Sequence, residues 1–379
     1  MDPPLGTSPI FNLSINDTFN ASACEDVSEL RIAFISIGSC LSILGCASNG
    51  ILLFMFLSKT EKSYPFQTFL AFLDFMLCAL YIHSFGLLSI SVEYKIPFLY
   101  DFVMDTNVMS LVMSRVVQLS IPYTLIANSL EKLTMILGYD CESRFSLYVR
   151  IGIIMTLFGT MTALRLNCFK MFFIHVEPLC EYFHRKWLSS DAEEVIRWKD
   201  FEHNLTFVHT IFSFLLLLFC NIYVVYKLRT QHRRTRRQST SPAQLFSSSS
   251  ARNQAALEIR EQQFKIKCAT ETTAVIISAY LVCNLCNFVL YIIENFKSEI
   301  ILDGNGGFKP WYVISCDVGS NMFVFSSAVR IFIYYKYNRE INHCFRVLIK
   351  NTPLMRYARG DSGKKIDDDN LLKMERVDV

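Results

Sequence analysis

The stretch LAFLDFMLCALYIHSF, residues 70–85, decides how the rest of the chain is interpreted. It is apolar enough to lie in hydrocarbon, yet it contains one carboxylate, that of Asp74. Moving an ionised carboxylate into hydrocarbon costs several kcal/mol unless a partner or a proton neutralises it. We therefore expect a membrane-spanning helix whose acid is neutralised by a group from another segment.

The composition of the whole chain is that of a membrane protein. Of its 379 residues, 52% are hydrophobic and 14% are aromatic. Windows of about 20 apolar residues, the length of a helix that crosses a bilayer, occur repeatedly. The approximate limits of these seven windows are 32–57, 65–90, 106–137, 151–174, 205–227, 269–293 and 311–335. The sequence therefore predicts an all-α membrane protein, with a seven-transmembrane helix bundle over residues 32–335.

The distribution of charge predicts the orientation of this bundle. Three sequons, at Asn12, Asn16 and Asn20, crowd into residues 1–31, which indicates an extracellular glycosylated tail. With that end outside, Lys and Arg gather in the inner segments, above all in residues 228–267. We expect this long connection to be a basic and partly disordered inner loop. The two signals agree, and they favour a multi-pass protein of the plasma membrane.

Two segments follow the last span. Residues 336–351 have the basic, amphipathic pattern of a short inner helix that lies on the membrane surface. Cys344 on that helix is a candidate for palmitoylation. Residues 352–379 are expected to be a disordered cytoplasmic tail. Contact with lipid headgroups explains the basic runs, so we expect the bilayer and not nucleic acid as their partner.

Topology and two motifs resemble one family. Seven spans, a large basic third inner loop and a short inner helix resemble the rhodopsin-like (family A) G-protein-coupled receptors. Ser48-Asn49-Gly50 in the first span is similar to the Gly-Asn of that family. Leu70-Ala71-Phe72-Leu73-Asp74 matches its L-A-x-x-D pattern in the second span. The resemblance covers about residues 30–350.

Other motifs of the family are altered in this chain. The D/E-R-Y of the third helix appears as Glu131-Lys132-Leu133, and the N-P-x-x-Y of the seventh as Arg330-Ile-Phe-Ile-Tyr334. The sixth helix reads Tyr280-x-x-Cys283-Asn284, without the Trp and the Pro of the family, so the usual proline kink is not expected. Such departures resemble divergent invertebrate, nematode-type peptide-receptor-like members.

The resemblance also implies a disulfide. Receptors of the family join the outer end of the third helix to the second outer loop, but this chain has no Cys between Cys78 and Cys141. Cys180 in that loop is then left to pair with Cys24 or Cys316.

The resemblance suggests a partner for the buried acid. In the family this Asp faces a polar core, often with a sodium ion and an Asn of the seventh helix nearby. Arg330 occupies that Asn position here, so we infer an ion pair with Asp74, flanked by Asn49 and Ser326, with Tyr334 completing a buried polar switch. The alternative is that Arg330 reaches the headgroups, roughly 8 Å away at 1.5 Å per residue, while Asp74 is protonated.

The resemblance implies two binding regions. For coupling to a heterotrimeric G protein at the inner end, the candidates are Glu131, Lys132, Lys265 and Lys267. For the ligand pocket, the candidates are Arg115, His209, Glu177, Glu181, Asn284 and Asp317. The acidic outer segments favour a cationic or amidated peptide by charge complementarity. Arg115 stands near the place where amine receptors hold an aspartate, which disfavours a biogenic amine.

We therefore expect a G-protein-coupled receptor that binds an extracellular neuropeptide. A chemosensory receptor for small molecules is the alternative with the same fold. A transporter or channel is a third, although no internal repeat is evident. We expect neither an enzyme nor a cofactor, because the spans contain no H-E-x-x-H or G-x-S-x-G motif and no cluster of metal ligands.

Overall fold

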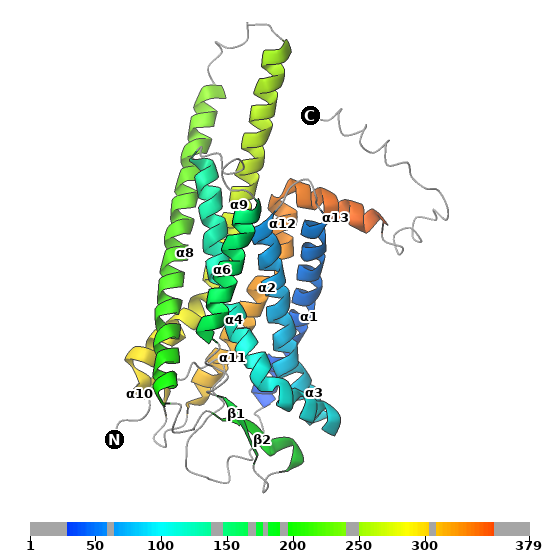
Figure 1. Ribbon diagram of the computed structural model, residues 1–379, viewed down its shortest axis with the longest axis vertical. Coiled ribbons are helices and arrows are strands. Elements are labelled where there is room, and N and C mark those ends of the chain that lie inside the picture. The colour runs from blue at the N-terminus through cyan, green and yellow to red at the C-terminus, as the bar shows by residue number, and fades with distance from the viewer. Residues whose placement is uncertain are drawn as a thin grey trace, which may run out of the picture.

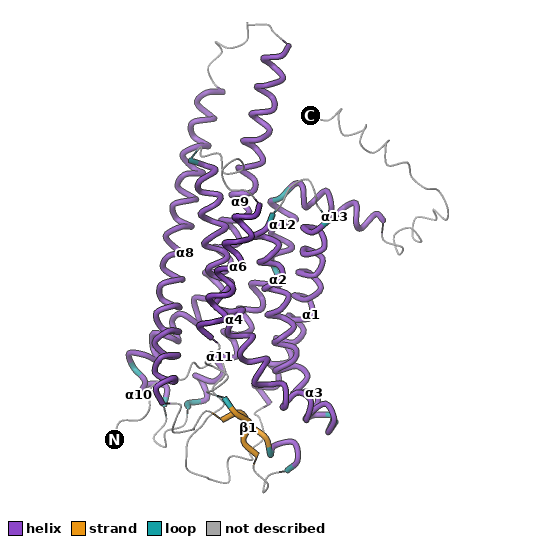
Figure 2. Tube along the Cα trace, in the orientation of Figure 1, coloured by secondary structure: helices purple, strands orange, loops and turns teal. Residues whose placement is uncertain are grey.

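The protein folds into a bundle of long helices with a small β-hairpin at one end (Figure 1, Figure 2). The structure is a computed structural model that describes residues 29–58, 64–137, 147–165, 172–176, 181–189, 196–239, 250–302 and 308–351. The helices are α1 (Glu29–Leu57), α2 (Pro65–Tyr81), η2 (Ile82–Leu87), α3 (Leu88–Glu93), α4 (Pro97–Ile136), α6 (Leu147–Arg165), η3 (Tyr182–His184), α8 (Ile196–Ser239), α9 (Ser250–Phe296), α10 (Ser298–Ile301), α11 (Pro310–Ala328), α12 (Arg330–Tyr337) and α13 (Arg339–Asn351). The strands are β1 (Phe173–Val176) and β2 (Lys186–Ser189), which pair antiparallel.

Seven segments of the described chain are long and apolar enough to cross a membrane. The second runs from α2 through the π-helical turn η2 into α3, and the seventh consists of α11 and α12. Each of the seven predicted windows falls on one of these segments, so their number and order are confirmed. The chain is a multi-pass membrane protein.

Two of the predicted boundaries are wrong. The third span begins at Pro97, well before residue 106, because proline suits the first position of a helix and Ile96 before it is extended. The fourth span was expected to reach residue 174, but residues 173–176 form β1. A short apolar run that follows a helix cannot be distinguished from its last turn by periodicity alone.

The centre of the bundle is formed by α4. Its buried side chains, among them Leu111, Val117, Ile121 and Leu125, point toward several neighbouring helices. By contrast, α6 buries only Ile154 and Arg165. Large apolar side chains on the outward faces of the peripheral helices are exposed, as expected where lipid and not water surrounds the bundle.

Much of the segment 228–267 is helical, both from Leu257 onward, where the heptad-like spacing predicts an early start of the sixth helix, and in the end of α8, which was not predicted. Helix α8 continues to Ser239 and α9 begins at Ser250, so both extend past the other helices at one end of the bundle (Figure 1). Strong helix formers such as Ala, Leu, Glu and Gln in residues 255–263 explain the extension of α9. Residues 240–249 lie outside the described part.

The two ends of the bundle differ. One carries β1 and β2 and is called the hairpin end here (Figure 1). The other carries α13 and is called the α13 end. The N–H of Ile341 donates to the side chain of Asn338 (3.2 Å), which caps the start of α13, and Ile341 and Phe345 pack on the core.

Candidate functional site

A buried ion pair joins the second and seventh spans. Asp74 is fully buried in α2, and Arg330, the first residue of α12, is 2% exposed. Arg330 donates from Nη1 to Oδ2 of Asp74, and the hydroxyl of Ser327 donates to Oδ1 (2.8 Å). Both carboxylate oxygens therefore accept a hydrogen bond, and the guanidinium is buried inside the bundle. The neighbour is Ser327 and not the expected Ser326, whose hydroxyl donates to the carbonyl of Phe323 (2.7 Å).

A break in the seventh span positions the side chain of Arg330 beside Asp74. Helix α11 ends at Ala328, and α12 begins after the single turn residue Val329. Side chains of α1 bond to the carbonyls before the break: Asn49 donates to the carbonyl of Ser327 (3.2 Å) and Ser48 to that of Ala328 (3.4 Å). Buried carbonyls need such partners where a helix is interrupted. Asn49 thus supports the ion pair through the backbone of Ser327 and not by direct contact.

Two tyrosines surround the guanidinium. Tyr280 of α9 and Tyr334 of α12 both lie close enough to Arg330 to interact with it electrostatically. Tyr334 is buried and packs edge-on against Phe56 of α1, with ring centroids 5.4 Å apart. Tyr280 was not among the predicted switch residues, although it also lines the cavity described next.

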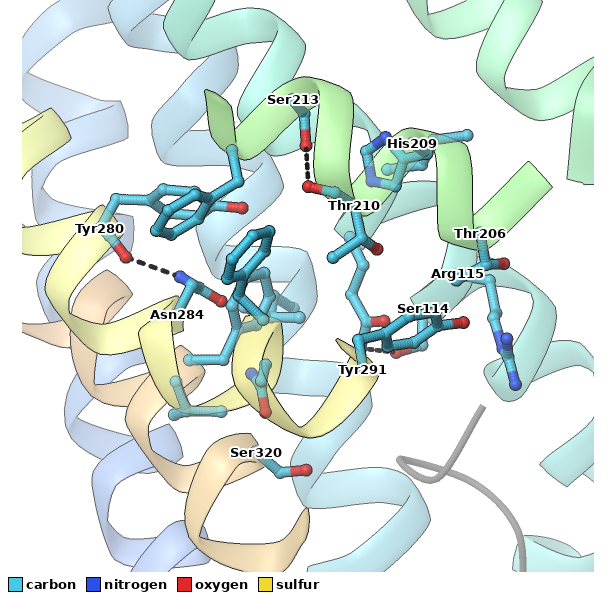
Figure 3. A pocket seen from close by; sticks show the side chains of 18 of the residues that line it. Ser114, Arg115, Thr206, His209, Thr210, Ser213, Tyr280, Asn284, Tyr291 and Ser320 are labelled. Atoms are coloured by element: carbon cyan, nitrogen blue, oxygen red, sulfur yellow. Dashed lines mark hydrogen bonds between the residues drawn. The ribbon is translucent and has the colours of Figure 1, made fainter. Parts of the chain in front are cut away.

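A cavity of about 120 Å³ lies inside the bundle. Residues of α2, α4, α6, α8, α9 and α11 line it, and Figure 3 shows Tyr280 and Asn284 on the side opposite Arg115 and Thr206. Among the predicted pocket residues, Arg115, His209 and Asn284 line this cavity. Asn284 donates to the carbonyl of Tyr280 (2.9 Å) in its own helix.

The remaining predicted pocket residues lie elsewhere. Asp317 pairs with Arg31 of α1 (3.3 Å) and does not line the cavity. Glu181 is exposed beside η3, also away from the lining. Glu177 lies outside the described residues, as do the sequons Asn12, Asn16 and Asn20.

The hairpin is held to α4 by a cluster that we call the hairpin clamp: Tyr100, Asp101, Asp105, Tyr182 and Lys186. Lys186 of β2 pairs with Asp101 (2.8 Å) and Asp105 (3.2 Å), and Tyr182 donates to Asp101. The hydroxyl of Tyr100 lies 3.3 Å from the N–H and 3.4 Å from the carbonyl of Lys186. The hydrogen bond to Asp101 raises the pKa of Lys186 above its ordinary value.

The clamp joins the start of α4 to the hairpin by ion pairs and hydrogen bonds. Cys316 carries a free, buried thiol in α11, so its expected pairing with Cys180 is not present in the structure. Cys180 and Cys24 themselves lie outside the described residues. Cys344, the palmitoylation candidate, is a partly buried free thiol that packs against the core.

The predicted coupling residues lie toward the α13 end, where they form two groups. Glu131 pairs with Lys132 (3.4 Å) and with Arg150 of α6 (3.2 Å), and Lys132 is buried. Lys267 pairs with Glu271 (3.8 Å) along α9 and does not meet Glu131 or Lys132 in a salt bridge among the described residues. The side chain of Lys265 is outside the described part.

A neutral network joins three spans near this end. Gln67 of α2 donates to Asn128 of α4 (3.0 Å), and Asn128 donates to Thr273 of α9 (3.4 Å). All three side chains are buried. We call these three residues the polar latch, since they connect α9 to the rest of the bundle. They were not among the predicted site residues, although their polarity within apolar spans was an available signal.

Comparison with known proteins supports the fold. No family model and no curated protein matches the chain. Among solved structures, squid rhodopsin is similar over 96% of this chain and 99% of its own, with a TM-score of 0.60 and 15% sequence identity. Identity this low shows the fold alone. The predicted fold class, a helical membrane protein with a seven-transmembrane bundle, is confirmed, and the bundle has the fold of squid rhodopsin.

Proposed function

We propose that this protein is a G-protein-coupled receptor of the plasma membrane whose extracellular ligand is a neuropeptide, as in the divergent invertebrate branch of the rhodopsin-like family. One observation carries the proposal: Tyr280 lines the cavity and also lies beside Arg330 of the buried ion pair. A ligand in the cavity therefore has a direct mechanical connection to the element that joins the second and seventh spans.

The proposal places the hairpin end outside and the α13 end in the cytoplasm. This orientation follows the sequons in residues 1–31 and the basic segments near α8, α9 and α13. Glu131, Lys132, Lys265 and Lys267 would then face the G protein as α9 moves. Residues 336–351 would rest on the inner leaflet and residues 352–379 would form the tail.

Switching is proposed to use the ion pair and the polar latch together. A ligand that binds the active arrangement more tightly than the inactive one shifts the population toward it. Displacement of Tyr280 moves α9 and alters the contact between Tyr280 and Arg330. Separation of Thr273 from Asn128 then allows the α13 end of α9 to move away from α4. The receptor itself makes and breaks no covalent bond, which is why we propose no enzyme activity.

A second candidate function is a chemosensory receptor for small molecules. The cavity of about 120 Å³ favours it, because that volume holds one small molecule but not a whole peptide. Localisation to sensory cilia would support this candidate, and localisation to neurons, muscle or gut would support the peptide receptor.

The test is a screen of peptides, each as the free acid and the amide, with nucleotide exchange on several heterotrimeric G proteins as the readout. We expect at least one peptide to drive exchange on the full-length chain. Asn284→Ala in the cavity should weaken its potency about tenfold or more, whereas Val282→Ala, exposed on the outer face of the same helix, should not. Solute or ion flux without any exchange would contradict the proposal and favour a transporter or channel.

A further inference from the structure

A stripe of side chains from α9 lines one side of the cavity. It includes Tyr280, Asn284, Asn287 and Tyr291, which recur at the three- and four-residue spacing of one helix face. Asn284 and Asn287 therefore present two carboxamides to the cavity from neighbouring turns of the same helix.

Each carboxamide is oriented by a bond to the backbone. Asn284 donates from Nδ2 to the carbonyl of Tyr280 (2.9 Å), and Asn287 donates from Nδ2 to the carbonyl of Gly319 in α11 (3.2 Å). The nitrogen must face the carbonyl in both cases, because two oxygens cannot hydrogen-bond to each other. Figure 3 shows the oxygen of Asn284 on the far side of its amide from this bond. Among the described residues none donates to either amide oxygen, so both oxygens are acceptors without a donor.

Hydroxyl groups of the lining add further acceptors. Ser320 donates to the carbonyl of Cys316 (2.9 Å) and Ser213 donates to that of Thr210 (3.5 Å), so each hydroxyl hydrogen is used within its own helix. Only the lone pairs of these two oxygens remain for a ligand. A ligand that suits this lining must therefore donate hydrogen bonds.

The charges around the cavity favour an uncharged ligand. Arg115 interacts electrostatically with the buried Glu294, and Arg165 donates from Nη1 to the hydroxyl of Thr206 (3.0 Å). Both guanidinium groups thus have interactions within the protein, with which a ligand carboxylate would compete. Among the described residues that line the cavity there is no Asp or Glu, so a ligand ammonium would be buried without a counter-ion. An uncharged donor is therefore the complement of this cavity.

The remaining walls of the cavity are aromatic. Phe214 and Phe288 stack with ring centroids 4.3 Å apart, and Phe323 meets Tyr280 edge-on with ring centroids 6.0 Å apart. At about 10–15 Å³ for each water-sized site, the volume corresponds to roughly ten waters. The cavity therefore has space for one aromatic ring with a short polar end.

We propose that the cavity binds an uncharged aromatic primary amide, whose two N–H groups donate to the side-chain oxygens of Asn284 and Asn287. A primary amide suits this pair because its nitrogen carries two donors, one for each oxygen. The group comes either from the C-terminal amide of a peptide or from a small free amide. The inference deepens the proposed function and rests on it, because it takes the cavity to be the ligand site of the receptor.

The test compares four probes on the purified full-length chain, with thermal unfolding as the readout. They share one aromatic skeleton: 3-phenylpropanamide, its uncharged methyl ester without a donor, the anion 3-phenylpropanoate and the cation 3-phenylpropylamine. We expect the amide at millimolar concentration to raise the melting temperature more than each of the other three. No effect of the amide, or an effect of any other probe as large as that of the amide, would overturn the inference.

Variants of Asn284 test the acceptor itself. Asn284→Leu should weaken amide binding about tenfold, because a buried N–H of the ligand is left without an acceptor, and it should leave ester binding unchanged. Asn295→Leu is the matched control: Asn295 lies on the same helix and donates to the carbonyl of Tyr291 (2.8 Å), but it does not line the cavity. Unchanged amide binding in Asn284→Leu would contradict the inference.

Asn284→Asp guards against a loss that merely reflects a damaged fold. It keeps the shape of the side chain and supplies the counter-ion that the cavity lacks, so it should bind 3-phenylpropylamine more tightly than the wild type does. A variant that binds the amine no better than the wild type would show that this oxygen does not face the ligand.

An N-acetylated tripeptide that ends in phenylalanine amide identifies the source of the amide. Tighter binding than that of 3-phenylpropanamide indicates a peptide end, and equal or weaker binding indicates a small amide; both results support the inference. The two proposals fail separately. Amide binding without nucleotide exchange by any ligand overturns the receptor function alone, while exchange driven by other ligands, with no amide binding, overturns this inference alone.

Discussion

Asp74 and Arg330 show how a charge is accommodated in an apolar bundle. Each carboxylate oxygen accepts one hydrogen bond, from Arg330 and from Ser327. An ion pair of this kind contributes little net stability compared with apolar residues of the same shape, because both groups are desolvated. Removing one partner lowers the stability of the fold much more, since it leaves the other charge buried without a counter-ion.

We therefore predict that Arg330→Met lowers the stability of the bundle by about 3–5 kcal/mol. The double change Arg330→Met with Asp74→Leu should recover much of that loss, because no uncompensated charge remains. Thermal unfolding in detergent measures both. Arg346→Met, an exposed arginine of α13, is the control and should leave the melting temperature unchanged. A double variant no more stable than Arg330→Met would show that the two residues are not coupled.

At this scale the sequence revealed charged residues better than neutral ones. Asp74 and Arg330 could be singled out because a charge in an apolar span needs an explanation. Ser327 could not be distinguished from Ser326, since the choice depends on the helix break at Val329. Tyr280 and the polar latch were missed because neutral polar groups in a helix are often satisfied by its own carbonyls.

At the scale of elements, the polar latch is the contact that must open if α9 moves. We predict that Thr273→Val raises ligand-independent nucleotide exchange by roughly two- to tenfold, the effect of losing one hydrogen bond of about 0.5–1.5 kcal/mol. The change keeps the side-chain volume and removes the acceptor of Asn128.

Thr272→Val is a matched control for this prediction. Thr272 is equally buried, but its hydroxyl donates to the carbonyl of Cys268 within α9 (2.7 Å) and not to another span. Basal exchange should therefore stay at the wild-type level. A rise of the same size in both variants would indicate general loosening of α9 and not a latch.

The hairpin clamp makes a second prediction about an element. Lys186→Met should accelerate amide hydrogen exchange over residues 181–189 roughly fivefold, because two partly exposed ion pairs contribute about 1 kcal/mol together. Sodium chloride at about 1 M should accelerate exchange in the wild type and have little further effect in the variant. Lys95→Met, an exposed lysine before α4, should behave like the wild type. Exchange that is insensitive to both salt and Lys186→Met would contradict the clamp.

The pH dependence of the clamp follows from the raised pKa of Lys186. A cation whose pKa is raised by folding contributes fully below its unfolded pKa, about 10.4, and the contribution disappears as the pH rises through the folded value. Lys186 should therefore add no pH dependence to the hairpin between pH 6 and pH 9.

The helices and strands could be predicted from the sequence where the length and hydropathy of a segment determine its structure. The seven spans needed only an apolar window, because a backbone in hydrocarbon must satisfy its own hydrogen bonds as a helix. The hairpin was missed, since strands of four residues carry almost no periodic signal. The long end of α8 was not predicted, because its run of basic residues indicates an inner loop as readily as a helix.

At the scale of the whole molecule, the proposed orientation can be tested by glycosylation. Replacing Asn12, Asn16 and Asn20 by Gln should abolish the mobility shift that a peptide glycosidase produces in the wild type. Asn204→Gln is the control, because the hydroxyl of Thr206 in that sequon is buried and bonded to Arg165. A tail without glycan that is cleaved by protease from the cytoplasmic side would reverse the orientation.

The distance along the chain between Asp74 and Arg330 has a consequence for biosynthesis. The two residues are separated by 256 positions. A ribosome adding about 5–20 residues per second needs roughly 13–50 s to bridge that interval. During that interval Asp74 has no contact with Arg330, and a product truncated before the last span never acquires this partner. We expect such truncations to be removed by quality control in the endoplasmic reticulum, even when six complete spans have been made.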